Sequence, residues 1–260
     1  MQLSYGFGRA GSARQVKMEE MKDIQSSIDH RRINIKKVGV KTVSYPVTVL
    51  DKAKSRQNTI ATVNMYVNLP HQFKGTHMSR FVEILNQYHG TIDLLNFREI
   101  LQEMKKRLDA EASHMEIEFP YFLTNGASSD SLNIRPYTCV MCGSLADEED
   151  LELRIEIPIS LPTSRTCQNS LPCSTGKWGY ARVAVRFTTF MWIEDLITEI
   201  EKSIDREIEV GSAKDKNVLS VESVTRSIGT CLAGLAKIKS YSVRVENLCD
   251  DYSTFAMLDS

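Results

Sequence analysis

The sequence lacks long hydrophobic runs and any excess of charge of one sign. No apolar stretch is long enough to cross a bilayer and no charged-then-apolar leader opens the chain, so we expect neither a transmembrane helix nor a signal peptide. Lysine and arginine (32) nearly balance aspartate and glutamate (33), which excludes a global field that would attract nucleic acid or an anionic membrane. We therefore expect a cytoplasmic protein whose anion sites are local.

Cysteine and histidine are also scarce. The six cysteines are scattered along 260 residues, which argues against a secreted disulfide scaffold and favours reduced thiols. No histidine follows His114, so the second half of the chain has no imidazole for metal binding or proton transfer. The whole sequence is 42% hydrophobic and 25% charged, which is typical of a globular protein with a substantial core.

Hydrophobic periodicity predicts nearly the same order of strands and helices twice. In the first half, strands are expected at 41–50, 60–69, 115–123 and about 135–142, with amphipathic helices at 79–88 and 94–112. In the second half, strands are expected at 151–159, 181–190 and 241–248, helices at 192–206 and 220–238, and a weak last element at 251–258.

This order predicts an α+β fold made of two tandem ββααββ-like units, with mostly antiparallel sheets and helix pairs on one face. The units are expected at 23–146 and 147–260, as one bimodular domain. Residues 1–22 precede them and begin with a segment rich in glycine, serine and arginine that has no apolar periodicity. We expect this extension to be disordered.

Several segments resemble type IB GTP cyclohydrolases. They lie at 24–40, 45–49, 69–81 (LPHQFKGTHMSRF), 116–122 and 190–196, and with the element order the resemblance covers residues 23–247. It implies the tunnelling fold, in which such units join into barrels, and a homo-oligomer, a dimer or tetramer, with sites shared between subunits. It also implies a zinc enzyme that opens the purine ring of GTP.

A basic segment after the second predicted strand suggests an anion site. A glycine-containing turn leads into a predicted helix N-terminus there, where free N–H groups favour phosphate. The donors in and beside this turn are Lys74, His77, Ser79 and Arg80, and a second basic cluster includes His30 and Arg31. The alternative is a helix cap with solvated charges.

The metal ligands implied by the resemblance are a cysteine, a histidine and a glutamate, and two of the three are replaced. Thr163 stands at the cysteine position and Thr175 at the histidine position, and neither is a good zinc ligand. Only the glutamate is retained, as Glu207, directly after the helix expected at 192–206. We therefore expect no cofactor, unless Cys167 and Cys173 rebuild a site for zinc or another divalent metal.

Those two cysteines have other possible roles. Cys167 and Cys173 are candidates for a reversible disulfide or a nucleophile, with ordinary loop thiols as the alternative. Cys139 and Cys142 have metal-site spacing, but on a strand they point to opposite faces. Cys231 lies on the apolar face of a predicted helix and is expected in the core.

The resemblance to type IB GTP cyclohydrolases places Glu222 at the position of the carboxylate that binds the edge of the purine ring. This is chemically reasonable, because guanine and pterins present adjacent N–H and NH₂ donors that one carboxylate can accept together. The alternatives are a first-turn glutamate favoured by the helix dipole for Glu222, and a solvated glutamate near a helix end for Glu207.

Three functions remain open. The first is a divergent family member that binds a purine- or pterin-like heterocycle and acts as a repurposed enzyme, with Glu207, Cys167 and Cys173 as candidate catalytic residues. The second is a genuine metal-dependent GTP cyclohydrolase with rearranged ligands, which forms dihydroneopterin triphosphate and formate. The third is a non-catalytic regulatory homologue. Nitrile reduction through a cysteine nucleophile is disfavoured, because the dinucleotide motif of that family is absent.

Overall fold

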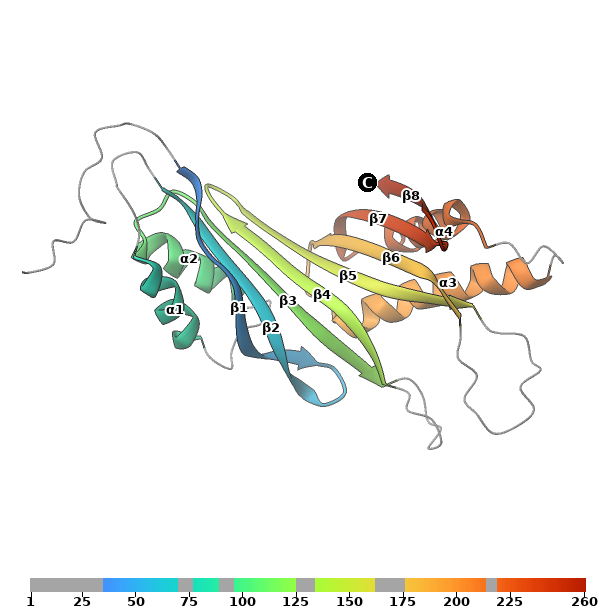
Figure 1. Ribbon diagram of the computed structural model, residues 1–260, viewed down its shortest axis with the longest axis horizontal. Helices are drawn as coiled ribbons and strands as arrows, with labels where there is room; N and C mark the ends of the chain where they lie inside the picture. The colour runs from blue at the N-terminus through green and yellow to red at the C-terminus, as the bar shows by residue number, and fades with distance from the viewer. Residues whose placement is uncertain (1–34, 70–76, 89–95, 125–133, 162–175, 214–218) are drawn as a thin grey trace, which may run out of the picture.

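The fold is an eight-stranded antiparallel sheet with four helices, within the residues that the computed structural model describes: 35–69, 77–88, 96–124, 134–161, 176–213 and 219–260 (Figure 1). The first half contains β1 (Ile35–Asp51), β2 (Ser55–Leu69), α1 (Met78–Gln87), α2 (Phe97–Arg107), β3 (Ser113–Thr124) and β4 (Ile134–Leu145). The second contains β5 (Glu149–Leu161), β6 (Gly176–Phe187), α3 (Ile193–Ala213), α4 (Val221–Ala233), β7 (Ile238–Leu248) and β8 (Ser253–Asp259).

The strands lie in the sheet in chain order, from β1 to β8. Because β4 pairs with β5, one continuous sheet runs through both halves of the chain. The α+β class is therefore confirmed, and each half follows the order of two strands, two helices and two strands. Among the described residues, no helix is long and apolar enough to cross a membrane.

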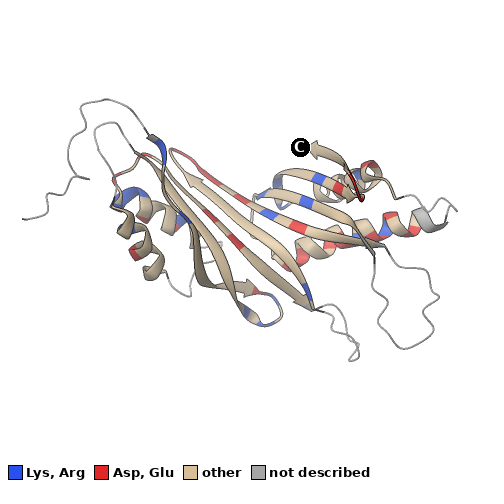
Figure 2. Cartoon of the chain, in the orientation of Figure 1, with Lys and Arg blue, Asp and Glu red and all other residues tan. Residues whose placement is uncertain are grey.

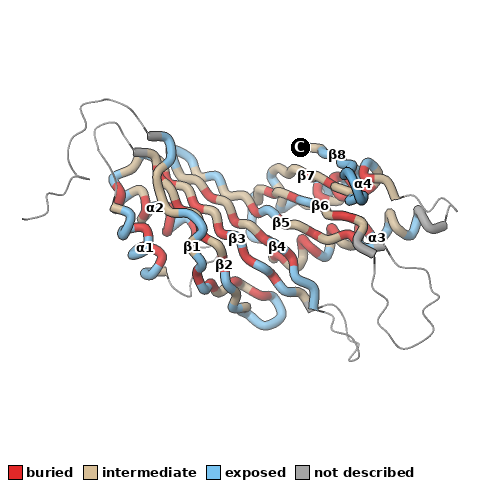
Figure 3. Tube along the Cα trace, in the orientation of Figure 1, coloured by how far each residue is buried: buried red, intermediate tan, exposed pale blue. Residues whose placement is uncertain are grey.

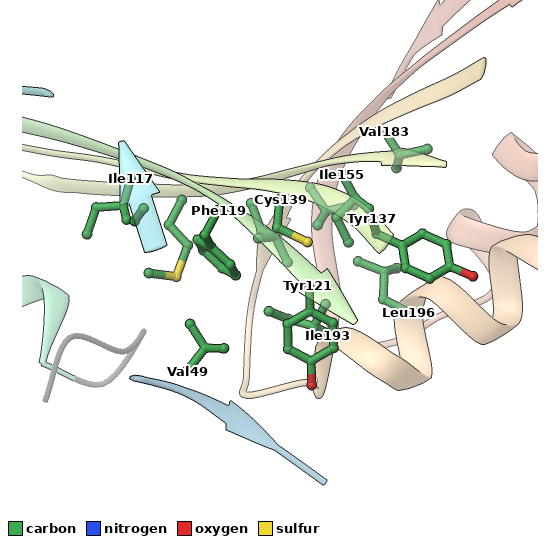
Figure 4. Close-up of a cluster of buried hydrophobic side chains, with 14 of the residues drawn as sticks. Val49, Ile117, Phe119, Tyr121, Tyr137, Cys139, Ile155, Val183, Ile193 and Leu196 are labelled. Atoms are coloured by element: carbon green, nitrogen blue, oxygen red, sulfur yellow. The ribbon is translucent and has the colours of Figure 1, made fainter. Parts of the chain in front are cut away.

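The core lies on one face of the sheet because alternate strand residues are apolar. Register places Phe119, Cys139, Ile155 and Val183 side by side on four neighbouring strands, and all four are almost completely buried (Figure 4). Helix side chains such as Leu196 cover this row. Each large apolar side chain buried in this way contributes roughly 1.5–3 kcal/mol, which holds the helix pairs against the sheet.

Charged residues recur along the strands (Figure 2), and on the face opposite the helices several of them pair across neighbouring strands. Arg182 on β6 contacts Glu156 on β5 at 2.8 Å and Glu246 on β7 at 2.9 Å. Arg186 contacts Asp150 at 2.6 Å, and its hydrogen bond holds the pKa of that carboxyl below its usual value. Figure 3 shows the resulting alternation of buried and accessible residues along the strands.

The predicted helix boundaries need correction. The second helix was expected to reach residue 112, but α2 ends at Arg107 because Asp109 has a positive φ of 48°, which breaks the helix. The fourth was expected to reach residue 238, but α4 ends at Ala233, before Gly234. The third was expected to end at 206, yet α3 continues to Ala213 because the apolar spacing continues through Ile208.

The strands are mostly longer than predicted. β1 begins at Ile35, and β6 begins at Gly176 rather than residue 181 because its first residues still pair with β5. Gly179 is needed there, since a Cβ at this position would lie 1.9 Å from the backbone oxygen of Glu246. The weak last element is a true strand, β8, whose Leu258 packs against the core.

β1 contains a strained bulge. Its pairing with β2 shifts between Val40 and Val43, and Thr42 has a positive φ of 58°, which a β-branched residue rarely adopts. The backbone N–H of Thr42 donates to Oδ1 of Asn64 at 2.9 Å. This bond satisfies a donor that the bulge removes from the strand ladder.

Candidate functional site

Helices α3 and α4 position the two glutamates that the sequence singled out. Glu207 lies in the second half of α3, half-buried in a groove between the two helices. It lies inside this helix rather than after it, which corrects the sequence interpretation, because α3 extends beyond residue 206. Glu222 is exposed in the first turn of α4, where Oγ of Ser220 caps the helix by accepting the N–H of Ser223 at 3.1 Å. Both glutamates thus belong to the same helix pair.

Cys231 lies on the wall of the same groove rather than in the core. Its thiol is half-buried and approaches the backbone oxygen of Glu199 at 3.6 Å. Burial raises the pKa of this thiol, and the nearby Glu199 carboxylate adds to the shift. The sequence interpretation of Cys231 as a core residue is therefore wrong, because this side of α4 faces α3 across an open groove.

A second groove, which sequence reasoning missed, lies on the other side of α3, against the ends of β4 and β5. Glu201 accepts the Tyr137 hydroxyl at 2.5 Å and lies 3.4 Å from Arg135. Asp205 and Glu209 line the same groove. The i, i+4, i+8 spacing of these three acids was the available sequence signal, since it places them on one helix face. Glu207 therefore faces α4, while Glu201, Asp205 and Glu209 face the end of β5.

The basic segment begins helix α1 as expected. His77 is the N-cap residue of α1, and Ser79 and Arg80 are exposed in its first turn. Nη1 of Arg80 donates to the backbone oxygen of Arg107 at 2.8 Å, so part of its donor capacity is used at the end of α2. In one chain α1 lies at the opposite end of the molecule from α4, so these groups do not meet Glu222 (Figure 1).

Several predicted site residues lie outside the described parts of the chain, and their roles stay predictions. They are His30, Arg31, Lys74, Thr163, Cys167, Cys173 and Thr175. The disordered extension predicted at 1–22 lies outside as well.

The described residues do not by themselves fit a zinc ion. Among them, no three histidine, cysteine, aspartate or glutamate side chains come together as a metal-binding group. Cys139 is buried on the helix side of the sheet, while Cys142 is half-buried on the other face, so the prediction that they point apart is confirmed. Burial raises the pKa of the Cys142 thiol to about 11, which disfavours the thiolate that zinc requires.

Comparison with known proteins places these observations in a family. Residues 21–248 match the family model described as type I GTP cyclohydrolase folE2. The protein named GTP cyclohydrolase FolE2 from Syntrophotalea carbinolica is 40% identical over 253 residues, covering 92% of this chain and 95% of that protein. Its namesake from Geobacter metallireducens is 42% identical over 242 residues, covering 88% of this chain and 92% of that protein.

Solved structures show a similar fold with little sequence identity. The uricase from Bacillus fastidious has a TM-score of 0.55 and 8% identity, covering 86% of this chain and 92% of that chain. The urate oxidase from Bacillus sp. TB-90 has a TM-score of 0.54 and 10% identity, covering 87% of this chain and 99% of that chain. At these identities the likeness concerns the fold alone.

Proposed function

The chain belongs to the type I GTP cyclohydrolase FolE2 family, and from this membership we propose that it binds a purine nucleotide of the GTP type beside the α3–α4 helix pair. The observation that carries the proposal is the exposed carboxylate of Glu222 in the first turn of α4, next to a groove that contains Glu207. Relatives that share about two-fifths of their residues with this chain carry the name GTP cyclohydrolase.

Glu222 suits recognition of a guanine or pterin ring. A carboxylate has only acceptors, and the ring edge presents two neighbouring N–H donors that it accepts in parallel. The capped first turn fixes where this carboxylate stands, because Ser220 ties the start of α4. A glutamate in the first turn is also favoured by the helix dipole when no ligand is bound. A binding measurement on a Glu222 variant is therefore needed to separate ligand recognition from stabilisation of the helix.

We propose that the chemistry following binding is altered relative to zinc cyclohydrolases. Thr163 and Thr175 stand where the resemblance places a ligating cysteine and histidine, and Glu207 is the ligand that remains. Such a member would be a repurposed enzyme that acts on a purine- or pterin-like heterocycle, with Cys167 and Cys173 as further candidate reactive groups.

A genuine GTP cyclohydrolase with rearranged ligands is the second candidate, and the names of the relatives favour it. In that case Cys167 or Cys173 would join Glu207 in holding zinc or another divalent metal, which would supply activated water for ring opening. The two cysteines lie in a segment that the structure does not describe.

We also propose that the complete site forms between copies of this chain. His77 and Arg80 lie at one end of the molecule and Glu222 at the other, so a second copy is needed to bring an α1 N-terminus beside a Glu222 (Figure 1). A homo-oligomer, dimer or tetramer, built from two tandem tunnelling-fold units per chain (23–146 and 147–260) is the arrangement expected from the resemblance and from the repeated element order.

One assay separates these candidates. The purified chain is incubated with GTP or a pterin and added Zn²⁺, Mn²⁺ or Fe²⁺, and ligand binding, ligand consumption, formate and dihydroneopterin triphosphate are measured. Consumption of a bound ligand without formate supports the altered member, whereas robust formation of formate and dihydroneopterin triphosphate from GTP identifies the metal-dependent cyclohydrolase. Binding without any turnover of purines or pterins identifies a regulatory homologue, and no binding of either ligand class contradicts the proposed function.

A further inference from the structure

The groove between α3 and α4 is lined by side-chain hydroxyls that already donate their protons to backbone oxygens. We call this lining the floor of the groove. Ser227 donates to the backbone oxygen of Ser203 at 3.1 Å, and Ser203 donates to that of Ile200 at 2.7 Å. Thr230 likewise donates to the backbone oxygen of Arg226 at 2.9 Å. Since a carbonyl oxygen can only accept, each hydroxyl must be the donor, and its own oxygen is left as an acceptor.

The groove therefore offers acceptors on its floor. Ser223 follows the same pattern, because its hydroxyl donates to the backbone oxygen of Ser220 at 3.1 Å. The carboxylate of Glu207 adds two more acceptor oxygens to the same groove. A phosphate, which at neutral pH is also an acceptor, would have to displace these backbone bonds to receive a hydroxyl proton, whereas the N–H edge of a heterocycle can donate to the hydroxyl oxygens directly.

Two arginines on the same groove supply the hydrogen-bond donors and the positive charge that the floor lacks. Arg206 on α3 and Arg226 on α4 are both exposed and line it. Neither makes an ion pair with any residue in the described parts of the chain, in contrast to Arg182 and Arg186, which are held by carboxylates. Planar guanidinium groups bind phosphate oxygens through paired N–H bonds, so these arginines are available for an anion.

The volume and the charges of the groove suit a ligand that has an anionic end and an end with N–H donors. Its volume of about 650 Å³ lies within the range of small-molecule sites, about 300–1,000 Å³. Glu199 already pairs with Lys202 at 2.7 Å, which reduces its repulsion of an anion. The N-terminus of α4, which carries a partial positive charge, lies at the end where Ser223 lines the groove.

We propose that Arg206 and Arg226 bind the phosphates of a nucleotide whose heterocycle lies along the acceptor floor beside Glu207. This assigns a phosphate site to the same helix pair that carries Glu222, in addition to the basic segment at α1. It rests on the proposed nucleotide function for the identity of the heterocycle, but the anion site is tested separately.

The experiment measures binding of inorganic tripolyphosphate, GTP and guanosine by calorimetry. The double variant Arg206→Gln/Arg226→Gln is compared with the parent and with Arg56→Gln/Arg98→Gln, which removes the same charge from exposed positions elsewhere. The first variant is expected to lose at least about tenfold in affinity for tripolyphosphate and GTP, because charge-assisted bonds to phosphate are lost, while guanosine binding is retained. Its residual anion binding should also depend less on salt.

Each outcome decides the proposal. Equal binding of tripolyphosphate and GTP by the parent and the Arg206/Arg226 variant overturns it, as does an equal loss in the control or no tripolyphosphate binding by the parent. If tripolyphosphate binding requires the two arginines but guanosine does not bind, the anion site stands and the nucleotide function fails. If guanosine binds but the affinity for GTP is the same in the parent and the Arg206/Arg226 variant, the nucleotide function stands and this proposal fails.

Discussion

The Tyr121 hydroxyl donates a 2.6 Å hydrogen bond to Oε1 of Glu194, which links β3 in the first half of the chain to the first turn of α3 in the second. The same oxygen accepts the backbone N–H of Lys52, in the turn between β1 and β2, at 2.5 Å. Burial raises the pKa of Tyr121 far above its usual value, and the bond to Glu194 adds to the shift, so the phenol remains a donor at all ordinary pH values. One carboxylate thus holds three separate segments.

Replacing Tyr121 by Phe should lower the free energy of unfolding by about 1–3 kcal/mol, because Glu194 loses a buried donor. The variant would leave Oε1 of Glu194 with the Lys52 N–H alone, and the other oxygen of Glu194 has no partner among the described residues. Urea unfolding followed by circular dichroism is the measurement. Tyr252→Phe, at a side chain that is 67% exposed, is the control and should change little. Equal stability of the two variants would contradict the role of this bond.

Replacing Thr42 by Gly should stabilise the protein. A β-branched residue at positive φ is strained, and glycine removes a cost of about 1–2 kcal/mol while adding some backbone entropy to the unfolded chain. We expect a net gain of roughly 0.5–1 kcal/mol in urea unfolding. Thr62→Gly, in the middle of β2, is the matched control and should destabilise. A loss at both positions would show that the bulge is not strained.

The contribution of Arg186 to stability should depend on pH. The hydrogen bond from Arg186 holds the folded-state pKa of Asp150 below its usual value of 3.8, so the pair stabilises the fold above that pH and the contribution is lost as pH falls through the lower, folded-state pKa. Arg186→Gln should therefore lower the urea midpoint at neutral pH and have a smaller effect at pH near 3. An effect of equal size at both pH values would assign it to packing instead.

Replacing Glu222 by Gln should weaken binding of a guanine nucleotide or pterin by roughly thirty- to a thousandfold, or about 2–4 kcal/mol, because the amide places an NH₂ against a ligand donor. Calorimetry with the parent and the variant measures this. Glu99→Gln is a matched control, since Glu99 is an exposed glutamate in the first turn of α2. If the parent and Glu222→Gln bind the ligand equally, the pocket implied by the resemblance is not the working site.

The isolated protein should carry well under one zinc ion per chain, because Glu207 alone cannot replace a set of three ligands. Elemental analysis of protein purified without chelators tests this. The result that would reverse the expectation is one equivalent of zinc that disappears in Cys167→Ser or Cys173→Ser, which would identify a rebuilt site.

The order of strands and helices could be predicted because the buried positions alternate strictly. In β3, for example, Met115, Ile117 and Phe119 face the core and the residues between them do not. Element ends were less predictable because they depend on local geometry, such as the positive φ of Asp109 that ends α2. The strain at Thr42 had no sequence signal, since threonine is common in strands.

The candidate site was only partly predictable. The helix predicted from residue 220 placed Glu222 in its first turn, and the structure agrees. The sequence could not say which face of α3 carries Glu207, because that depends on how far the helix continues and on which helix packs beside it. The hydroxyl of Ser227 donates to the backbone oxygen of Ser203 across the helix pair, so its acceptor character follows only from that packing.

The pairing of β4 with β5 also bears on how the chain responds to cleavage. Eight residue pairs, from Thr138 with Glu156 to Leu145 with Glu149, join the two strands across a short turn. A protease cut in that turn would break the covalent link between the halves but leave their hydrogen bonds and shared core in place. The two fragments would therefore stay together as one particle and come apart only when the sheet itself unfolds.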